Sequence, residues 1–247
     1  MKYTALKTIY AWKKDVNQSL LEVGFRKVLS DDAMYVLWRS NSVTIIGLHV
    51  DDFAIVSNDT VVKTKLDNYL ESKYTMKDEP MDVYVGVNVD HDEEKGVLEL
   101  HQRPYVEKML KKFDMETCKR SKIPAQVGID LSPGVITEKD KKKMVDVPYR
   151  NAVGGLMYAV THTMPELSLA VNQLTRFFND PEPKHWVATK KVFKYLRGVK
   201  DMCGIKFRRE GNKDLMAYVD SDWSQHSYLR RRSVSGYCVF LAGGPVS

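Results

Sequence analysis

Two adjacent carboxylates, Asp51 and Asp52, interrupt the apolar stretch Thr44-Ile-Ile-Gly-Leu-His-Val-Asp-Asp-Phe-Ala-Ile-Val56, and this pair constrains the fold more than any other feature. The apolar flanks favour two β-strands that pair as a hairpin and face a core. Ionised carboxylates are costly there unless a cation or hydrogen-bond donors satisfy them. One interpretation is an acidic hairpin turn, since Asp is common in turns. The other is a metal site, because paired carboxylates hold the Mg²⁺ ions of phosphoryl transfer. The residues alone favour neither.

The composition is that of an ordinary globular chain. Apolar residues make up 43 % and charged residues 28 % of the 247 residues, which argues against a wholly disordered or fibrous chain. The length suits one large domain or two modest ones. The longest apolar stretches are far short of a bilayer span, and the N-terminus has no apolar signal region, so we expect neither a membrane protein nor a secreted one.

The cysteines and histidines argue against a zinc centre. Cys118, Cys203 and Cys238 form no CxxC pair and cannot all be bridged, which indicates a reducing compartment. The six histidines are scattered along the chain, so a hard cation with oxygen ligands is the metal that the residues favour. The net charge of +6 favours a polyanionic partner.

Hydrophobic periodicity predicts an α+β chain in which strands and helices alternate before a helical block and a second β region. The expected helices cover residues 12–23, 59–70, 106–113, 149–162, 165–179 and 183–198. The expected strands cover residues 35–38, 43–48, 53–56, 83–90, 97–101, 205–208, 215–219 and 234–241. Asp59 or Thr60 is the expected cap of the second helix. Residues 121–147, which contain prolines and the charged run 138–143, are interpreted as an exposed connector and the first domain boundary.

The helix expected over residues 183–198 carries a basic face. Lys190, Lys194 and Arg197 share this face, with Lys191 beside Lys194. Residues 184–209 contain nine lysines and arginines against one acidic residue, Asp201. Such a face is either a solvated surface or a set of phosphate contacts, and the second interpretation predicts nucleic-acid binding with a steep salt dependence.

Several stretches carry a family resemblance. His49-Val-Asp-Asp52 resembles the Tyr-Val-Asp-Asp box of reverse transcriptases. Further stretches are similar, in collinear order, to the polymerase of copia-type LTR retrotransposons. They are Tyr84-Val-Gly-Val-Asn-Val89, Leu100-His-Gln-Arg-Pro-Tyr-Val-Glu-Lys-Met-Leu110, Val147-Pro-Tyr-Arg-Asn-Ala-Val-Gly-Gly-Leu-Met-Tyr158, His185-Trp186, Tyr195-Leu-Arg-Gly198, Tyr218-Val-Asp-Ser-Asp-Trp223 and Ser233-Val-Ser-Gly-Tyr-Cys-Val-Phe-Leu-Ala-Gly-Gly244.

The resemblance implies a domain order. Residues 1–120 would form the C-terminal part of a reverse-transcriptase palm with β-hairpins, and 121–147 a linker. Residues 148–200 would form a helical thumb or connection, and 201–247 the first strands of a ribonuclease H-like domain. The chain would then be a fragment of the retrotransposon Pol polyprotein.

The resemblance also implies site residues and partners. Asp51 and Asp52 would be the catalytic, metal-binding carboxylates of the polymerase, and Asp220 that of ribonuclease H, with Asp222 the less favoured ligand. The metal would be Mg²⁺, with Mn²⁺ as the alternative. The partners would be an RNA/DNA template-primer duplex, deoxynucleoside triphosphates and the rest of the polyprotein, but no membrane. The compartment would be the cytoplasm, within a virus-like particle, or the nucleus.

Four departures from the family lead us to expect that the chain alone is inactive. An earlier catalytic Asp and the fingers are not found, and the later ribonuclease H carboxylates are absent. A stretch that the family carries before Ala11-Trp12 is missing, and His49 replaces the usual Tyr. The alternatives are a non-catalytic nucleic-acid-binding remnant and a misfolded relic with exposed sheet edges.

Overall fold

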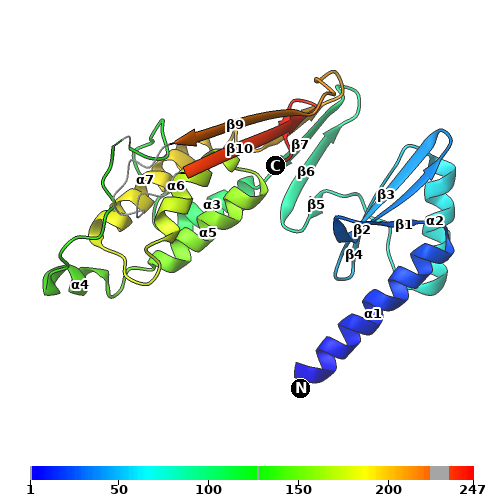
Figure 1. Ribbon diagram of the computed structural model, residues 1–247, viewed down its shortest axis with the longest axis horizontal. Helices are drawn as coiled ribbons and strands as arrows, with labels where there is room; N and C mark the ends of the chain where they lie inside the picture. Colours follow the sequence, from blue (N-terminus) through cyan, green and yellow to red (C-terminus); the bar gives the residue numbers. More distant parts are fainter. Residues whose placement is uncertain (1, 127, 223–233) are drawn as a thin grey trace. The chain divides into compact units, whose positions relative to one another are not determined.

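The computed structural model describes residues 2–126, 128–222 and 234–247, which form two compact units, residues 1–85 and 86–247 (Figure 1). Trp223, which ends one of the family-like stretches, and Ser233, which begins another, lie outside the described residues. Helices and strands both occur in each unit, which confirms the mixed α+β class. The boundary between the units follows Val85, whereas the sequence placed its first boundary within residues 121–147.

The first unit is an antiparallel sheet with two helices. Its elements are α1 (Lys2–Glu22), β1 (Arg26–Val28), β2 (Asp31–Arg39), β3 (Ser42–His49), β4 (Asp52–Ser57), α2 (Thr60–Lys73) and the short β5 (Val83–Tyr84). The first four strands lie in the order β1-β2-β3-β4. In the pairing of β3 with β4, Ile46 lies opposite Ile55 and His49 opposite Asp52.

Alternation along the strands builds the core of the first unit. Residues of one parity, such as Leu37, Ile46 and Leu48, are buried with the apolar stripes of the two helices. The core consists of Val16, Leu20, Phe25, Tyr35, Leu37, Ile46, Leu48, Val62, Leu66 and Leu70. Residues of the other parity stay accessible, and Trp38 is 73 % exposed.

The start of α2 confirms the predicted cap. The Asp59 side chain accepts hydrogen bonds from the backbone N–H groups of Val61 and Val62 at 3.0 and 3.1 Å. These bonds satisfy two of the donors that the first turn of a helix leaves free. Helix α1 begins ten residues earlier than the periodicity indicated.

The second unit combines a helical core with two small sheets. Its elements are β6 (Val87–Asp92), β7 (Val97–His101), α3 (Arg103–Lys112), α4 (Glu138–Met144), α5 (Tyr149–His162), η1 (Pro165–Leu167), α6 (Ser168–Thr175), α7 (Pro183–Val199), β8 (Ile205–Arg208), β9 (Met216–Asp222), β10 (Val234–Leu241) and β11 (Gly244–Pro245). The strand expected over 83–90 is divided because Val85 and Gly86 have positive φ of 49° and 77°. The helix expected over 165–179 starts as a 3₁₀ turn and ends at Thr175.

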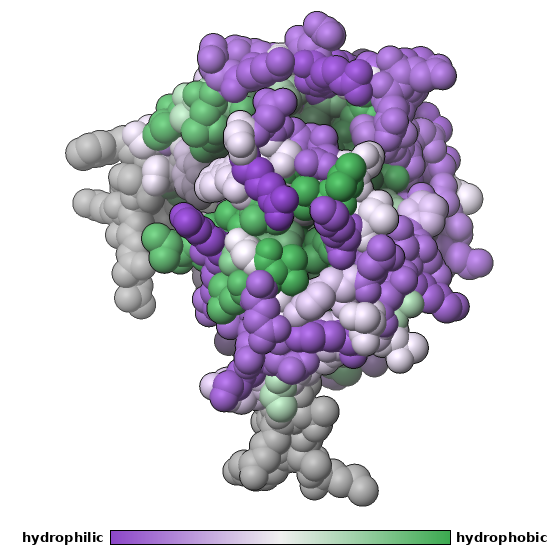
Figure 2. Space-filling view, turned by 90° about the vertical axis from the view of Figure 1, so that its right-hand side faces the viewer, coloured by the Kyte–Doolittle hydropathy of each residue, from purple (hydrophilic) through white to green (hydrophobic). Residues whose placement is uncertain are grey.

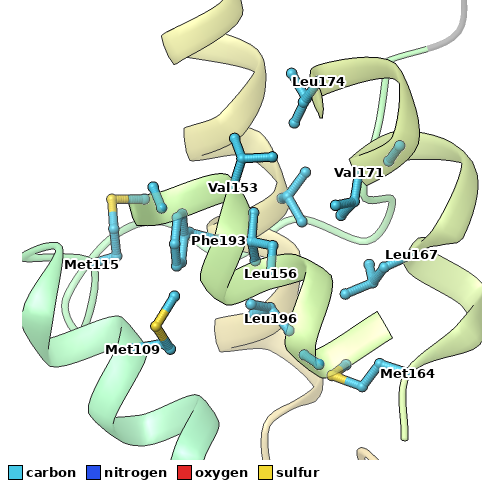
Figure 3. Close-up of a cluster of buried hydrophobic side chains, with 14 of the residues drawn as sticks. Met109, Met115, Val153, Leu156, Met164, Leu167, Val171, Leu174, Phe193 and Leu196 are labelled. Carbon is cyan, nitrogen blue, oxygen red and sulfur yellow. The ribbon is translucent and has the colours of Figure 1, made fainter. Parts of the chain in front are cut away.

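Helices α3, α5, α6 and α7 share one apolar core. Figure 3 shows Met109 of α3, Leu156 of α5, Val171 of α6 and Phe193 of α7 directed toward one another, and all four side chains are buried. Leu131 joins the same core at 2 % exposure. The expectation that residues 121–147 form an exposed connector is therefore wrong at this position, because the segment buries an apolar side chain. Its charged run forms the exposed helix α4.

Strand β8 differs from the expectation that residues after 204 open a new sheet. It pairs with β7, with Leu98 opposite Phe207 and Leu100 opposite Ile205. Strands β9, β10 and β11 form the other sheet in the order β11-β10-β9. The paired residues of β7 and β8 are separated by about a hundred residues in the sequence. Local periodicity does not predict such a pairing.

Candidate functional site

Strand β3 ends at His49 and β4 begins at Asp52. We call the segment from His49 to Asp52 the acidic turn. His49 and Asp52 close the hairpin as partners, so Val50 and Asp51 are the two turn residues. Both carboxylates are exposed, and neither forms an ion pair within the described part of the chain. The structure thus realises the hairpin turn, and the carboxylates avoid the burial cost that an apolar surrounding would impose.

The backbone of the acidic turn is strained at Val50. Its φ is 58°, in the left-handed region that two-residue hairpin turns usually fill with Gly or Asn. A β-branched residue is a genuine outlier there. Such a conformation costs roughly 1–3 kcal/mol and persists only where surrounding contacts impose it.

One of these contacts comes from helix α1. The indole Nε1–H of Trp12 donates a hydrogen bond to the Val50 carbonyl oxygen at 2.8 Å. The Trp12 ring also meets Tyr74 edge-on, with 4.9 Å between ring centroids. Burial is the main reason why the pKa of the Tyr74 phenol is raised. A side chain 38 residues away therefore contacts the backbone of the acidic turn.

Tyr84 approaches the β3–β4 hairpin next to the acidic turn. Its hydroxyl lies 3.5 Å from the point that a Cβ on Gly47 would occupy, so glycine leaves room for the ring. Burial raises the pKa of Tyr84, and the negative charges of Asp52 and Asp31 raise it further. The phenol is therefore close enough to Asp52 to sense its charge, and it stays protonated at neutral pH.

An open hollow of about 650 Å³ lies beside the acidic turn in the first unit. Its walls come from α1, β4, α2 and the segment that follows α2. The charged residues in its lining are Asp51, Asp52, Asp67, Glu71, Lys73, Lys77, Asp78 and Glu79. Acidic residues thus outnumber basic ones in the lining. Figure 2 shows one face of the protein, on which hydrophilic residues surround a group of hydrophobic ones.

The acidic turn offers part of a ligand set for a divalent cation. Carboxylate oxygens on an exposed turn suit one hydrated Mg²⁺ ion, which keeps several waters. No group of three or more His, Cys, Asp or Glu side chains that could hold a metal occurs among the described residues. The residues present therefore fit a single hydrated ion and do not fit a two-metal site, which needs further bridging ligands.

Asp220 lies in the second unit, on β9. It is opposite Gly236 of β10, its side chain is exposed, and its Oδ1 accepts a hydrogen bond from the Ser221 backbone N–H at 2.9 Å. Asp222 closes β9, and its side chain lies outside the described residues. As at the acidic turn, the described residues supply no three-ligand group around Asp220.

The basic residues of α7 do not share one free surface. Arg197 donates a hydrogen bond to the Cys118 carbonyl oxygen, and the Lys190 ammonium lies 5.8 Å from the Trp186 ring centroid. Lys191 and Lys194 line a small pocket of about 100 Å³ that is otherwise mostly apolar. Two of the four predicted phosphate contacts thus have partners within the protein, whereas the half-buried Lys191 and Lys194 form no ion pair within the part of the chain that the structure describes.

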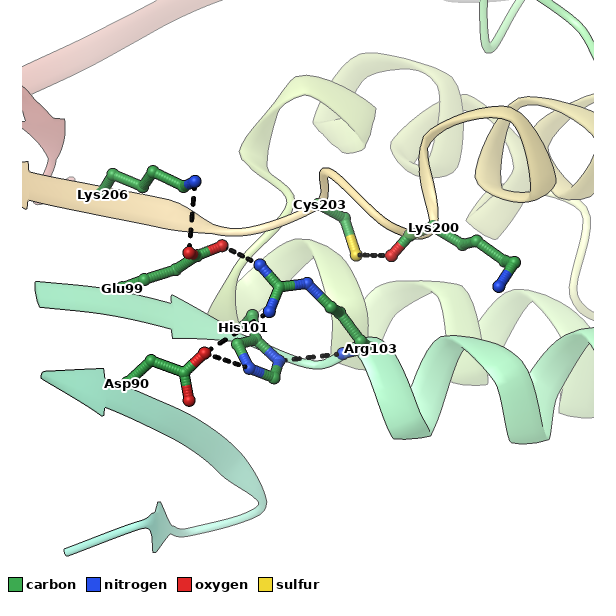
Figure 4. Close-up of polar contacts among 7 residues, drawn as sticks. All are labelled: Asp90, Glu99, His101, Arg103, Lys200, Cys203 and Lys206. Atoms are coloured by element: carbon green, nitrogen blue, oxygen red, sulfur yellow. Dashed lines mark hydrogen bonds and ion pairs between the residues drawn. The ribbon is translucent and has the colours of Figure 1, made fainter. Parts of the chain in front are cut away.

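A second polar group, which we call the charge-paired cluster, lies at the base of the β6–β7 hairpin. It contains Asp90, Glu99, His101, Arg103 and Lys206 (Figure 4). Arg103 bonds to Glu99, and Lys206 pairs with the other oxygen of Glu99 at 3.2 Å. Only His101 and Arg103 of this cluster lie within the family-like stretches, and the sequence pattern predicted no role for either residue.

His101 is the buried member of the charge-paired cluster, and its bonds indicate its tautomer. Nδ1 accepts the Arg103 backbone N–H at 3.3 Å, so Nε2 carries the proton toward Asp90 Oδ2 at 3.1 Å. The next residue, Gln102, is fully buried, and its Oε1 accepts a hydrogen bond from Thr163 at 2.9 Å. Gln102 Nε2 and Arg103 Nε have no hydrogen-bond partner in the described structure. The cluster ties β6, β7 and β8 to the start of α3.

Comparisons with known proteins define the class. The family model described as "Reverse transcriptase (RNA-dependent DNA polymerase)" matches residues 2–127, and the chain belongs to this reverse transcriptase family. Within it, the chain is similar to Pol polyproteins of copia-type transposons. It is 33 % identical over 239 residues to the retrovirus-related Pol polyprotein from transposon RE2 of Arabidopsis thaliana, and 32 % identical over 242 residues to that from transposon TNT 1-94 of Nicotiana tabacum.

Both matches cover 96 % of this chain, but the chain spans only 16 % and 18 % of the length of these relatives. The resemblance to copia-type polymerases is thereby confirmed. No solved structure matches the chain. Within the described residues, no helix is both long enough and apolar enough to cross a membrane.

Proposed function

We propose that the chain is a segment of a copia-type Pol polyprotein in which Asp51 and Asp52 are metal-binding carboxylates of an RNA-directed DNA polymerase. The observation that carries this proposal is a tight hairpin turn that exposes two adjacent carboxylates in a member of the reverse transcriptase family. The partners would be a template-primer duplex, deoxynucleoside triphosphates and other parts of the polyprotein.

Asp51 and Asp52 would hold Mg²⁺, or Mn²⁺, at the acidic turn. When bound, the metal helps to activate a primer hydroxyl and to stabilise the leaving oxygen of the nucleotide. The contribution of the chain itself is geometric. The β3–β4 pairing presents two adjacent, exposed carboxyl side chains at one hairpin tip.

We further propose that the isolated chain does not extend primers. The described residues supply two carboxylates and no three-ligand group around them, whereas a two-metal site uses additional bridging oxygens. Loss of preorganised charge stabilisation lowers rates by orders of magnitude. We therefore expect the isolated chain to bind a metal ion without catalysing primer extension.

Two measurements on the purified chain test these proposals. The first is Mn²⁺ titration followed by paramagnetic broadening of the Asp51 and Asp52 amide signals, with Asp51→Asn/Asp52→Asn as the control. We expect broadening at the turn in the wild type and none in the double variant. The second is Mg²⁺-dependent primer extension on an RNA template, where we expect no product from either protein. Extension by the wild type alone would overturn the proposed inactivity, and the absence of turn broadening would overturn the metal assignment.

We propose for the C-terminal part that Asp220 occupies a metal-binding position of a ribonuclease H-like segment. Its exposed position within a β-hairpin and the collinear family resemblance support this assignment. In the same Mn²⁺ titration, the Ser221 amide should broaden because it hydrogen-bonds to Asp220. This broadening should disappear in Asp220→Asn. If the Ser221 signal is unaffected in the wild type, Asp220 does not bind the metal in this chain.

The second candidate function is non-catalytic binding of nucleic acid through α7. Lys191 and Lys194 favour it, because neither has an ion-pair partner among the described residues. Binding to an RNA–DNA duplex should then weaken steeply with salt. It should fall in Lys191→Gln/Lys194→Gln and survive Asp51→Asn. Loss of binding in Asp51→Asn at constant salt would reject this candidate.

A further inference from the structure

Trp12 contacts the acidic turn through its backbone rather than through a carboxylate. The indole N–H reaches the carbonyl oxygen of Val50 at 2.8 Å, and Val50 is the turn residue with a positive φ of 58°. A bond to this carbonyl restrains the orientation of the peptide that links Val50 to Asp51. The contact therefore acts on the geometry of the turn as a whole.

The ring of Trp12 is itself held in place. It packs edge-on against Tyr74, which follows α2 directly. The Tyr74 hydroxyl donates to Asp15 Oδ2 at 2.7 Å and lies 2.8 Å from the hydroxyl of the buried Ser19, both on α1. These bonds fix the ring that supports Trp12. The indole donor is thus oriented by packing between α1 and the end of α2.

We propose that Trp12 is a positioning residue that holds the acidic turn in the conformation that presents Asp51 and Asp52 together. Valine disfavours a positive φ, so the turn needs an outside contact to remain in this conformation. Trp12 provides this contact across the first unit. The metal-binding consequence rests on the proposed function, whereas the conformational consequence does not.

The test uses a variant that removes only the donor. Trp12→Phe keeps an aromatic ring against Tyr74 and loses the N–H group. The matched control is Tyr69→Phe, which removes another side-chain hydrogen bond between α2 and α1, from the Tyr69 hydroxyl to Glu22 Oε2 at 3.1 Å. Two readouts are followed by NMR: the amide-to-Hα coupling constant of Val50, which reports φ, and the Mn²⁺ concentration that half-broadens the Asp51 and Asp52 amides.

We expect Trp12→Phe to change the Val50 coupling constant and to raise the half-broadening Mn²⁺ concentration about three- to tenfold, which is the effect of losing one hydrogen bond. Tyr69→Phe should change neither. Adding Val50→Gly to Trp12→Phe should restore the Mn²⁺ affinity to within about twofold, because glycine adopts positive φ without strain. A merely structural role of Trp12 would not be rescued at Val50.

Wild-type values of both readouts in Trp12→Phe would overturn the proposal. If the wild type shows no Mn²⁺ broadening, the proposed metal site fails, and the Val50 coupling constant alone decides the role of Trp12. Hydrogen exchange of the indole groups tests the wild type without any variant. The Trp12 indole should exchange more slowly than that of Trp38, which is 73 % exposed, and equal rates would overturn the proposal.

Discussion

In the acidic turn, two adjacent carboxylates face solvent without an ion-pair partner among the described residues, whereas in the charge-paired cluster Glu99 and Asp90 each contact a cation. The side chain of Glu99 is only 13 % exposed, and Arg103 and Lys206 both reach it. The same chemical group is thus left free at one place and neutralised at another.

This difference separates a pair of carboxylates that we propose to bind metal from carboxylates with a structural role. Burying a carboxylate is costly unless opposite charges and hydrogen bonds compensate for the lost water. Arg103 and Lys206 provide this compensation for Glu99, and the resulting contacts hold three strands and a helix together. An exposed, unpaired carboxylate contributes little to stability but remains able to bind a cation. Stability changes and Mn²⁺ binding should therefore respond to different substitutions.

The largest effect should come from breaking the charge-paired cluster. Arg103→Met leaves Glu99 and Asp90 with fewer cationic partners, and we expect the free energy of unfolding to fall by about 3 kcal/mol. Urea denaturation, followed through hydrogen exchange of the α5 amides, measures this change. Arg103→Met combined with Glu99→Gln should recover part of the loss. A single variant as stable as the wild type would show that the cluster is not structural.

A smaller loss should follow from acidification, and it should arise in the second unit. Burial lowers the pKa of His185, which stacks on Phe177 with 3.8 Å between ring centroids. The unfolded chain then binds a proton more readily than the folded one. The stability from neutral His185 is complete above its unfolded pKa of about 6.5 and declines as the pH falls toward its lower folded pKa.

Unfolding measured between pH 7.5 and 5.5 tests this expectation. In the structure, His185 Nε2 lies 3.0 Å from the Leu131 carbonyl oxygen. The decline should be reduced in His185→Gln, whose side-chain amide can donate to the same oxygen. An unchanged pH dependence in this variant would assign the effect to other groups.

Asp59, in the first unit, is intermediate between the unpaired carboxylates of the acidic turn and the paired ones of the cluster. Its side chain has no cationic partner among the described residues but accepts two backbone hydrogen bonds. Asp59→Ala should lower the stability by about 1 kcal/mol because the cap of α2 is lost. Thermal unfolding measures the change, and Asp59→Asn, which keeps an acceptor oxygen, should remain near the wild type. Equal losses in both variants would mean that charge, and not capping, stabilises the helix start.

The smallest effect on stability should come from the acidic turn itself. Asp51→Asn/Asp52→Asn should change the free energy of unfolding by less than about 0.5 kcal/mol, since exposed sites without partners contribute little. The same variant should abolish Mn²⁺ broadening at the turn. A large loss of stability would show that these carboxylates have a structural role, like those of the charge-paired cluster.

Local patterns predicted much of both units. The 3.6-residue period located α2, α5 and α7, and the alternation of apolar residues located β3, β4 and the β6–β7 hairpin. The position of Asp51 and Asp52 at a hairpin tip also followed from the sequence, because two apolar runs flank them. Their place before the apolar stripe predicted Asp59 or Thr60 as the cap of α2, and the structure shows that Asp59 is the cap.

Other features depend on residues that are distant in sequence. The bond from Trp12 to Val50 spans 38 residues, and the pairing of Glu99 with Lys206 depends on β8 lying against β7. Arg197 was predicted to meet phosphate, yet its guanidinium donates to the Cys118 carbonyl oxygen. Neither spacing nor composition identifies such partners.

The sequence by itself determined most of the helices and strands, the acidic turn and the relationship to copia-type reverse transcriptases. Only the tertiary structure decided which charges are paired, which strand joins which sheet, and what holds Val50 in its conformation. The physical reason is that helix and strand periods arise from the geometry of neighbouring residues, whereas pairing and burial arise from packing between elements that the chain brings together only on folding.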